Sequence, residues 1–293
     1  MSSLTDAQTA TVLLSSGIAS GLSALGALYM IISYLATPSI QKFSMKLVIS
    51  MMYSCLLYSL ANLLSYFNKI SEICYIEGVI RVSSSLSSLI WAMAILHTAY
   101  KQFTDYTKDI EKTYKILLLF NIIISLTPPF IISIGQFTNR FVYFQITNLF
   151  CNAQPSQWAL ILVDIPRWVI MGLTILYTIR LMRVINEILP LKSTQQYSRI
   201  YVYSVVLVVT WLPGTLYRLY IYFIGPPSFV IVLMHVIPTR LAGFMNAIIY
   251  GKDYYLRSRE EKSSDKEKKK HLLHGTKKPI QHISFQLNSE LIK

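Results

Sequence analysis

The stretch ILLLFNIIISLTPPFIISIG (residues 116–135) contains no charged side chain. A membrane core about 30 Å thick is crossed by about 20 apolar residues of α-helix, so this stretch predicts a membrane-spanning helix. The whole chain agrees, because 53% of its 293 residues are hydrophobic and only 14% are charged, whereas soluble domains carry about 25% charged residues. The sequence therefore predicts a membrane protein.

Other stretches of similar length and composition precede and follow this one. The fold class that they predict is an all-α membrane protein with a seven-transmembrane helix bundle. Residues 1–11 would be a short extracellular N-terminus, 12–251 the seven-helix core, and 252–293 a basic, mostly disordered cytoplasmic tail. The expected spans are residues 12–35, 45–67, 76–100, 115–135, 157–181, 200–224 and 230–250.

The distribution of Lys and Arg predicts the orientation of the bundle. With the N-terminus outside, 21 of the 27 basic residues lie in cytoplasmic segments, two lie outside and four lie within spans. Cytoplasmic loops carry an excess of Lys and Arg, so we expect the N-terminus outside and the C-terminus inside. The basic stretch 266–270 either binds acidic lipid headgroups or is simply solvated.

Two of the three cysteines fall on the side predicted to be extracellular. Cys74 precedes the third span, and Cys151 lies in the second outer loop. Disulfides persist in oxidising compartments, so we expect a Cys74–Cys151 bridge over the mouth of the bundle in preference to two free thiols. Cys55 lies within the second span and is expected to be a small packing residue.

Four arginines within the spans are the candidate ligand-binding residues: Arg81, Arg167, Arg218 and Arg240. One Arg at a helix centre costs about 2.5–3.5 kcal/mol on insertion scales, so each should face the bundle interior with a partner. Two interpretations stay open. Either the arginines have structural roles, as ion pairs or snorkelling side chains, or they bind an anionic ligand through bidentate guanidinium contacts.

Only two acidic residues are placed by their spacing to pair with these arginines. Asp164 lies three residues before Arg167, and Glu77 lies four before Arg81; both spacings bring side chains to one helix face. Neither Arg218 nor Arg240 has an obvious acid in the sequence.

Four other residues are candidates for a conformational switch. Pro213 removes a backbone hydrogen bond and predicts a kink in the sixth span, and Trp211 places a large ring beside it. Asn246 and Tyr250 share one face near the inner end of the seventh span. A plain kink and ordinary polar contacts between helices are the simpler alternatives.

No pattern in the chain predicts an enzyme, a cofactor or a metal site. There is no phosphate-binding glycine loop, no HExxH and no His/Cys cluster. The basic residues have no aromatic platform beside them, so no nucleic-acid partner is expected. Residues 230–250 contain no Lys, which excludes a retinal Schiff base there.

Several of these motifs together resemble those of G-protein-coupled receptors. TWLPG (residues 210–214) is similar to the Cys-Trp-x-Pro of that class, with Thr210 in place of Cys. NAIIY (246–250) is similar to Asn-Pro-x-x-Tyr, with Ala247 in place of Pro. The Asp-Arg-Tyr of rhodopsin-like receptors is absent, since the chain there reads LHTAYKQF (96–103).

A closer resemblance is to the cyclic-AMP-receptor-like family. It rests on WLPGTLYR (residues 211–218), LAGFMNAIIYG (241–251), ICYIEG (73–78) and LIWAMAI (89–95), and covers about residues 12–251. This resemblance implies a receptor that acts through a heterotrimeric G protein, with an anionic cyclic nucleotide as the prototype ligand.

The leading hypothesis is therefore a cell-surface receptor, in the plasma membrane, that senses an extracellular, cyclic-nucleotide-like anion. Binding at the arginines would favour a state in which the sixth helix pivots at Pro213 and activates a G protein. The alternatives are a transporter or channel for organic anions and a structural membrane protein.

Overall fold

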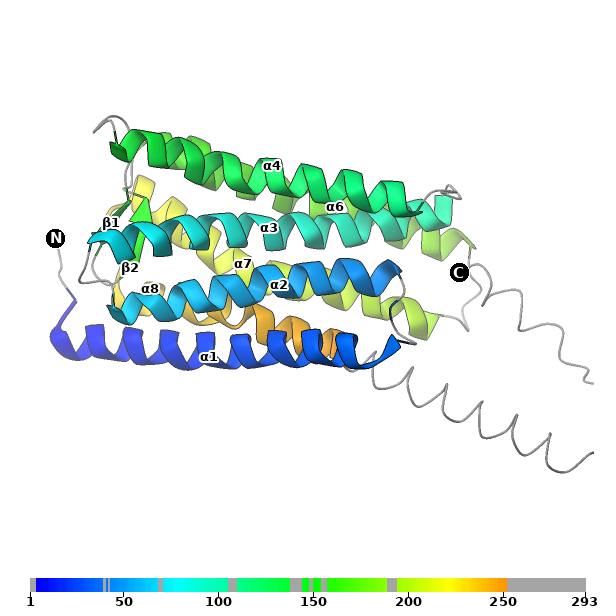
Figure 1. The fold of residues 1–293 in the computed structure, drawn as a ribbon, viewed down its shortest axis with the longest axis horizontal. Coiled ribbons are helices and arrows are strands. Elements are labelled where there is room, and N and C mark those ends of the chain that lie inside the picture. The colour runs from blue at the N-terminus through cyan, green and yellow to red at the C-terminus, as the bar shows by residue number, and fades with distance from the viewer. Residues whose placement is uncertain are drawn as a thin grey trace, which may run out of the picture.

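The computed structural model describes residues 4–38, 41, 43–67, 71–104, 110–137, 144–147, 150–153, 157–188 and 194–251. Long helices lie side by side in a bundle, and a short β-hairpin lies at the end of the bundle where the chain begins (Figure 1). The helices are α1 (Asp6–Ala36), α2 (Phe43–Leu64), α3 (Ser71–Thr104), α4 (Ile110–Phe137), α6 (Ile165–Ile188), α7 (Thr194–Phe223) and α8 (Phe229–Arg240).

Shorter elements complete the fold. The 3-10 turn η2 (Ser65–Phe67) ends α2, and the strands β1 (Phe144–Thr147) and β2 (Phe150–Ala153) pair antiparallel, with Ile146 opposite Cys151. The single turn α5 (Gln157–Ala159) and the π-helical segment η3 (Leu160–Asp164) lead directly into α6. The helical class is thus confirmed, and the hairpin is an addition, because only a loop was expected there. The predicted tail, 252–293, lies outside the described residues.

Helices suit this sequence because a membrane core offers no water to the backbone, and a helix satisfies its own peptide groups. The start of α1 shows how the first groups are satisfied. The Thr5 hydroxyl accepts a hydrogen bond from the Gln8 backbone N–H at 3.3 Å, and the Gln8 side chain accepts one from the Thr5 N–H at 3.1 Å. This capping box satisfies two otherwise unpaired donors.

Membrane-spanning length and composition are present in five of the described helices, and a sixth is a bent pair of segments. The five are Asp6–Ala36, Phe43–Leu64, Ile73–Lys101, Lys112–Gly135 and Leu160–Val184; the pair, Phe229–Arg240 and Ala242–Gly251, is bent by 40° after Pro238. The 30-residue helix α7 lies in the same bundle and contacts α6 and α8. The chain is therefore a multi-pass membrane protein, while the seven-span count and the orientation stay predictions.

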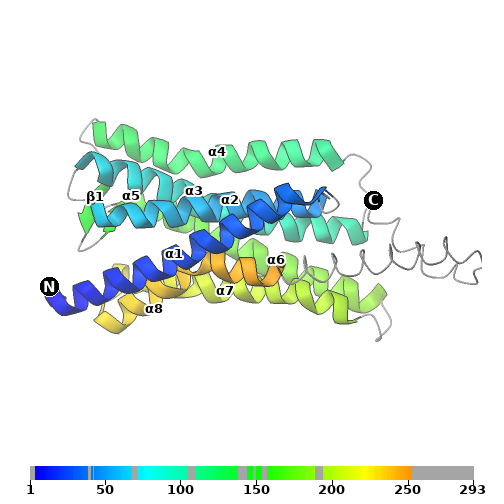
Figure 2. The same cartoon turned by 60° about the horizontal axis from the view of Figure 1, so that its bottom comes forward.

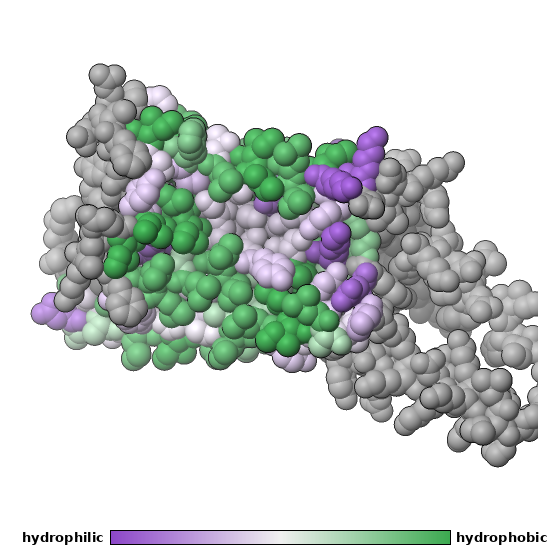
Figure 3. Space-filling view, viewed as in Figure 1, coloured by the Kyte–Doolittle hydropathy of each residue, from purple (hydrophilic) through white to green (hydrophobic). Residues whose placement is uncertain are grey.

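Large apolar side chains cover the outside of the bundle. Figure 3 shows hydrophobic residues along most of the described face, with hydrophilic residues gathered towards the ends. Burial is unequal among the helices: 61% of the most apolar window is buried in α2 and in α3, but only 28% in α4 and 22% in the span Leu160–Val184. The helices α2 and α3 therefore form the centre of the bundle, and α4 and α6 lie at its periphery.

Hydroxyl and amide side chains join the central helices. Ser54 of α2 and Ser87 of α3 are 2.7 Å apart, and Ser87 also donates to Asn121 of α4 at 2.8 Å. The amide of Asn121 returns a hydrogen bond to the Ser87 carbonyl oxygen at 3.0 Å. Polar pairs of this kind stabilise contacts between helices where apolar burial cannot distinguish protein from lipid.

α1 lies beside α8 and the segment that follows it (Figure 2), and small residues make this contact close. The Ser23 hydroxyl of α1 accepts hydrogen bonds from the Gly243 backbone N–H at 3.0 Å and from the Ser59 hydroxyl at 2.9 Å. Both serines are buried. Gly243 is thus in direct contact with α1, which a larger residue would prevent.

Replacing Gly243 with alanine is expected to lower the apparent melting temperature of the purified protein. A Cβ at this position would overlap the Ser23 hydroxyl, and would lie 3.1 Å from the Ser23 carbonyl oxygen and 3.2 Å from the Cys55 Cβ. Overpacking of a close contact costs about 1–3 kcal/mol. Gly21→Ala is the matched control, because a Cβ at Gly21 meets nothing within 4 Å; equal melting temperatures for the two variants would contradict the expectation.

Candidate ligand site

Four helices direct the candidate arginines towards one buried region. Arg81 comes from α3, Arg167 from α6 and Arg218 from α7, and these three line a single cavity of about 310 Å³ of empty space, open solvent included. The remaining cavity lining is Val82, Ala159, Val163 and Asp164. Arg240, at the end of α8, is 5% exposed and is close enough to Arg81 for the two charges to repel each other. We call the four residues the arginine cluster.

Glu77 is the acidic partner of Arg81, as the spacing predicted. Its Oε1 lies 3.0 Å from Arg81 Nη1 and accepts a hydrogen bond from the Ser65 hydroxyl at 2.8 Å. Glu77 is fully buried. Ser65 directly follows α2, so its hydrogen bond links the Glu77–Arg81 pair of α3 to the end of the neighbouring helix.

Asp164 is shared by two arginines. Its carboxylate lies 3.5 Å from Arg167 Nη1 and 3.9 Å from Arg218 Nε, and it accepts a hydrogen bond from the Tyr222 hydroxyl at 3.2 Å. The Asp164–Arg167 pair confirms the spacing argument. The expectation that Arg218 has no acid is wrong, because its partner lies on another helix, where sequence spacing has no bearing.

The aspartate occupies the last residue of the π-helical segment η3, directly before α6. Such π-bulges are rare and occur frequently at functional sites. Arg167, one turn later, donates a hydrogen bond to the Ser85 hydroxyl of α3 at 2.7 Å, and its Nε has no hydrogen-bond partner among the described residues. The cluster thus retains a donor that a bound anion can use.

Tyr58 of α2 is a member of the site that the sequence argument missed. Its ring lies 5.6 Å from the Arg240 guanidinium and 5.9 Å from the Trp211 ring. The chain has 20 tyrosines, and nothing in the sequence distinguishes Tyr58 from the others.

Three of the four candidate switch residues meet at a second cavity. Trp211, Asn246 and Tyr250 line about 470 Å³ of empty space, open solvent included, together with residues of α2, α3 and α6. The Asn246 amide lies 3.9 Å from the Cys55 thiol. Pro213 lies within α7 and is not among the residues lining this cavity. A switching role for these residues stays a prediction.

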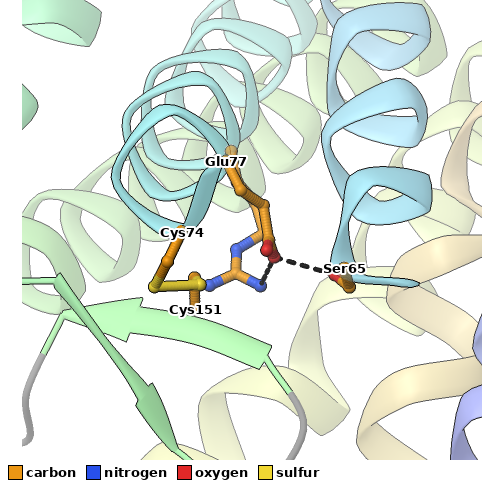
Figure 4. Close-up of a disulfide and its surroundings, with 5 residues drawn as sticks. Ser65, Cys74, Glu77 and Cys151 are labelled. Atoms are coloured by element: carbon orange, nitrogen blue, oxygen red, sulfur yellow. Dashed lines mark hydrogen bonds and ion pairs between the residues drawn. A yellow bond between two sulfur atoms is a disulfide. The ribbon is translucent and has the colours of Figure 1, made fainter. Parts of the chain in front are cut away.

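The expected disulfide is present and closes one end of the bundle. Cys74, in the first turn of α3, is bonded to Cys151 of β2, with their Cα atoms 5.2 Å apart. Figure 4 shows the bridge beside Glu77 and Ser65, at the end of the bundle that holds the hairpin. Cys55 is buried and forms no disulfide. The bridge therefore fixes the hairpin to the helix that carries Arg81.

Cys74→Ser and Cys151→Ser are each expected to lower the stability of the protein by the same amount. The double variant should be no less stable than either single variant. A disulfide contributes about 2–4 kcal/mol, more for longer loops, and this one closes a separation of 77 residues. Thermal unfolding in detergent measures the loss. Cys55→Ala is the control, since it leaves the bridge intact; clearly additive losses in the double variant would contradict a shared bond.

Comparison with solved structures identifies the fold. The chain superimposes on squid rhodopsin with a TM-score of 0.64, at 15% sequence identity, over 85% of this chain and 83% of that chain. No family model matches the chain. No curated protein matches it in sequence.

The described helices therefore have the same helical-bundle fold as squid rhodopsin. At 15% identity the likeness concerns the fold alone.

Proposed function

We propose that this protein is a cell-surface receptor in the plasma membrane that binds a small extracellular anion and activates a heterotrimeric G protein. The observation that carries the proposal is the convergence of four arginines, from α3, α6, α7 and α8, on one buried region of a receptor-type bundle. Guanidinium groups favour carboxylate and phosphate oxygens, to which they bind in bidentate geometry.

The charges of the described residues support an anionic ligand. Glu77 pairs with Arg81, and the single carboxylate of Asp164 lies beside both Arg167 and Arg218, so one acid serves two guanidinium groups. Burying positive charge in a membrane is costly, so an added anion is stabilised there. The resemblance to cyclic-AMP-receptor-like proteins suggests a cyclic nucleotide as the first ligand to test.

The mechanism that we propose follows the helices that carry the site. Arg218 and Trp211 both lie on α7, on either side of Pro213, where the helix lacks a backbone hydrogen bond. An anion that binds more tightly when α7 has moved shifts the population towards that state. The movement would change the cavity lined by Trp211, Asn246 and Tyr250 and open the opposite end of the bundle to the G protein.

Nucleotide-sensitive ligand affinity tests this function. Anion binding to membranes that contain the receptor and a G protein is expected to weaken when a non-hydrolysable GTP analogue is added, because the nucleotide dissociates the G protein and removes its stabilisation of the bound state. Binding that is unchanged by the analogue with every G-protein class would contradict receptor coupling.

Transport of an organic anion is the second candidate. The specific observation in its favour is the 40° bend between Phe229–Arg240 and Ala242–Gly251, because broken helices and intramembrane charges also build transporter sites. Flux of a labelled anion into proteoliposomes containing the purified protein would favour this candidate. A receptor is expected to show no flux above that of empty liposomes.

A further inference from the structure

The ring of Tyr58 contacts both the arginine cluster, at Arg240, and the Trp211 ring. It lies on α2, is 9% exposed, and packs between two helices that are distant from it in sequence, α7 and α8. From this position we propose that Tyr58 is a positioning residue that couples the state of Arg240 to the orientation of Trp211. The inference deepens the proposed receptor function and rests on it, because coupling has a purpose only where occupancy of the cluster is signalled.

Arg240 can exchange its contact with the Tyr58 ring for a contact with an anion. The guanidinium carbon lies 5.6 Å from the centre of the Tyr58 ring, within the range of a cation–π interaction, which contributes about 0.5–2 kcal/mol. A charge-assisted hydrogen bond from the same guanidinium to an anion is of similar or greater strength. An anion at Arg240 therefore competes with the ring for this cation.

The contact with Trp211 transmits the result to α7. The two rings have centroids 5.9 Å apart and planes inclined at 49°, a separation at which aromatic pairs have a preferred geometry. Trp211 lies two residues before Pro213. If the Tyr58 ring moves when Arg240 changes partner, Trp211 must repack, and it does so beside the weakest point of α7.

The location of Tyr58 on α2 makes it a suitable fixed point. α2 shares with α3 the highest buried fraction, 61%, among the five spans named above, and it packs against α1 and α3. If α7 and α8 rearrange, Tyr58 therefore changes its contacts while α2 stays in place. A purely structural Tyr58 would fill the same space but would leave Arg240 and Trp211 independent of each other.

The test is a double-mutant cycle with a spectroscopic signal from Trp211 in the full-length protein. The four tryptophans are replaced biosynthetically by 5-fluorotryptophan, and the Trp211 resonance in the ¹⁹F NMR spectrum is assigned by its loss in Trp211→Phe. Arg240→Gln is then compared with the parent protein in three backgrounds: wild type, Tyr58→Leu and Tyr53→Leu. Tyr53 is the matched control, because it lies on the same helix and is 46% exposed.

Arg240→Gln is expected to shift the Trp211 resonance in the wild-type and Tyr53→Leu backgrounds, and to leave it within its linewidth in Tyr58→Leu. The same shift in all three backgrounds would overturn the inference, as would no shift in the wild type. If Tyr58→Leu does not fold, Tyr58→Met gives the same comparison, since methionine fills similar space without an aromatic face. Tyr58→Phe, which keeps the ring, is expected to retain the shift.

A titration with inorganic phosphate separates this inference from the proposed function. Phosphate is expected to shift the Trp211 resonance in wild type and to lose this effect in Tyr58→Leu. Tyr58→Leu should still bind phosphate at least as tightly as wild type, because the arginines are intact and the ring no longer competes for Arg240. A cycle that shows coupling while wild type fails to bind any anion would contradict the anionic ligand and leave the role of Tyr58 supported.

Discussion

Replacing Arg218 or Arg240 with alanine is expected to weaken anion-dependent G-protein activation strongly at the lowest anion concentration that saturates wild type. Each guanidinium lost removes one charge-assisted contact, worth about 1.5–3 kcal/mol, which lowers anion affinity by about 10- to 150-fold. Arg218→Lys keeps the charge but not the planar fork, so it should retain part of the affinity. Radioligand binding and nucleotide exchange on the G protein measure the two effects separately.

Arg180→Ala is the control for the binding measurement, because Arg180 lies on α6 with Arg167 but is exposed. It should bind the anion with wild-type affinity. A full anion response in both Arg218→Ala and Arg240→Ala would overturn the assignment of the arginine cluster as the ligand site. The bundle and its disulfide would be unaffected by that result.

Replacing Asp164 with asparagine is expected to cause the largest loss of stability. The substitution leaves Arg167 and Arg218 without the carboxylate that they share, and breaking a buried ion pair by removing one partner costs about 3–5 kcal/mol. The Tyr222 contact can survive, because an amide oxygen also accepts a hydrogen bond. The apparent melting temperature in detergent should fall well below that of Glu187→Gln, a control at an exposed position of α6, the helix that directly follows Asp164.

Two further measurements identify the cause. Adding Arg218→Gln to Asp164→Asn should restore part of the lost stability, since the double variant buries one charge fewer. Inorganic phosphate should raise the melting temperature of Asp164→Asn more than that of wild type, because a bound anion replaces the missing carboxylate. A melting temperature for Asp164→Asn equal to that of Glu187→Gln would contradict a structural role for the shared acid.

Contacts within one helix were predictable from the sequence. The i,i+4 pair of Glu77 and Arg81 and the i,i+3 pair of Asp164 and Arg167 follow from helical geometry alone. The helical stretches followed from hydropathy, although their ends differ: the first helix begins at Asp6, several residues before the expected residue 12, because the capping box extends it beyond the apolar run.

Contacts between helices were not predictable, because they depend on the rotation and depth of each helix in the bundle. The sequence places Arg218 54 residues from Asp164 and Tyr58 far from both Trp211 and Arg240. No periodicity carries that information. The hairpin β1–β2 was missed for a related reason: its strands have four residues each, too few for an alternating pattern to appear.

The unequal burial of the helices has a practical consequence for engineering this protein. Residues of α4 face lipid over most of their surface, and exchanging one large apolar residue for another there, as at Ile123 or Phe130, leaves their environment unchanged. In α3, Leu86 and Leu89 have almost no exposed surface, so any change of volume must be absorbed by neighbouring helices. A deep mutational scan for surface expression should therefore return an α4 that tolerates exchanges between apolar residues beside an α3 that does not.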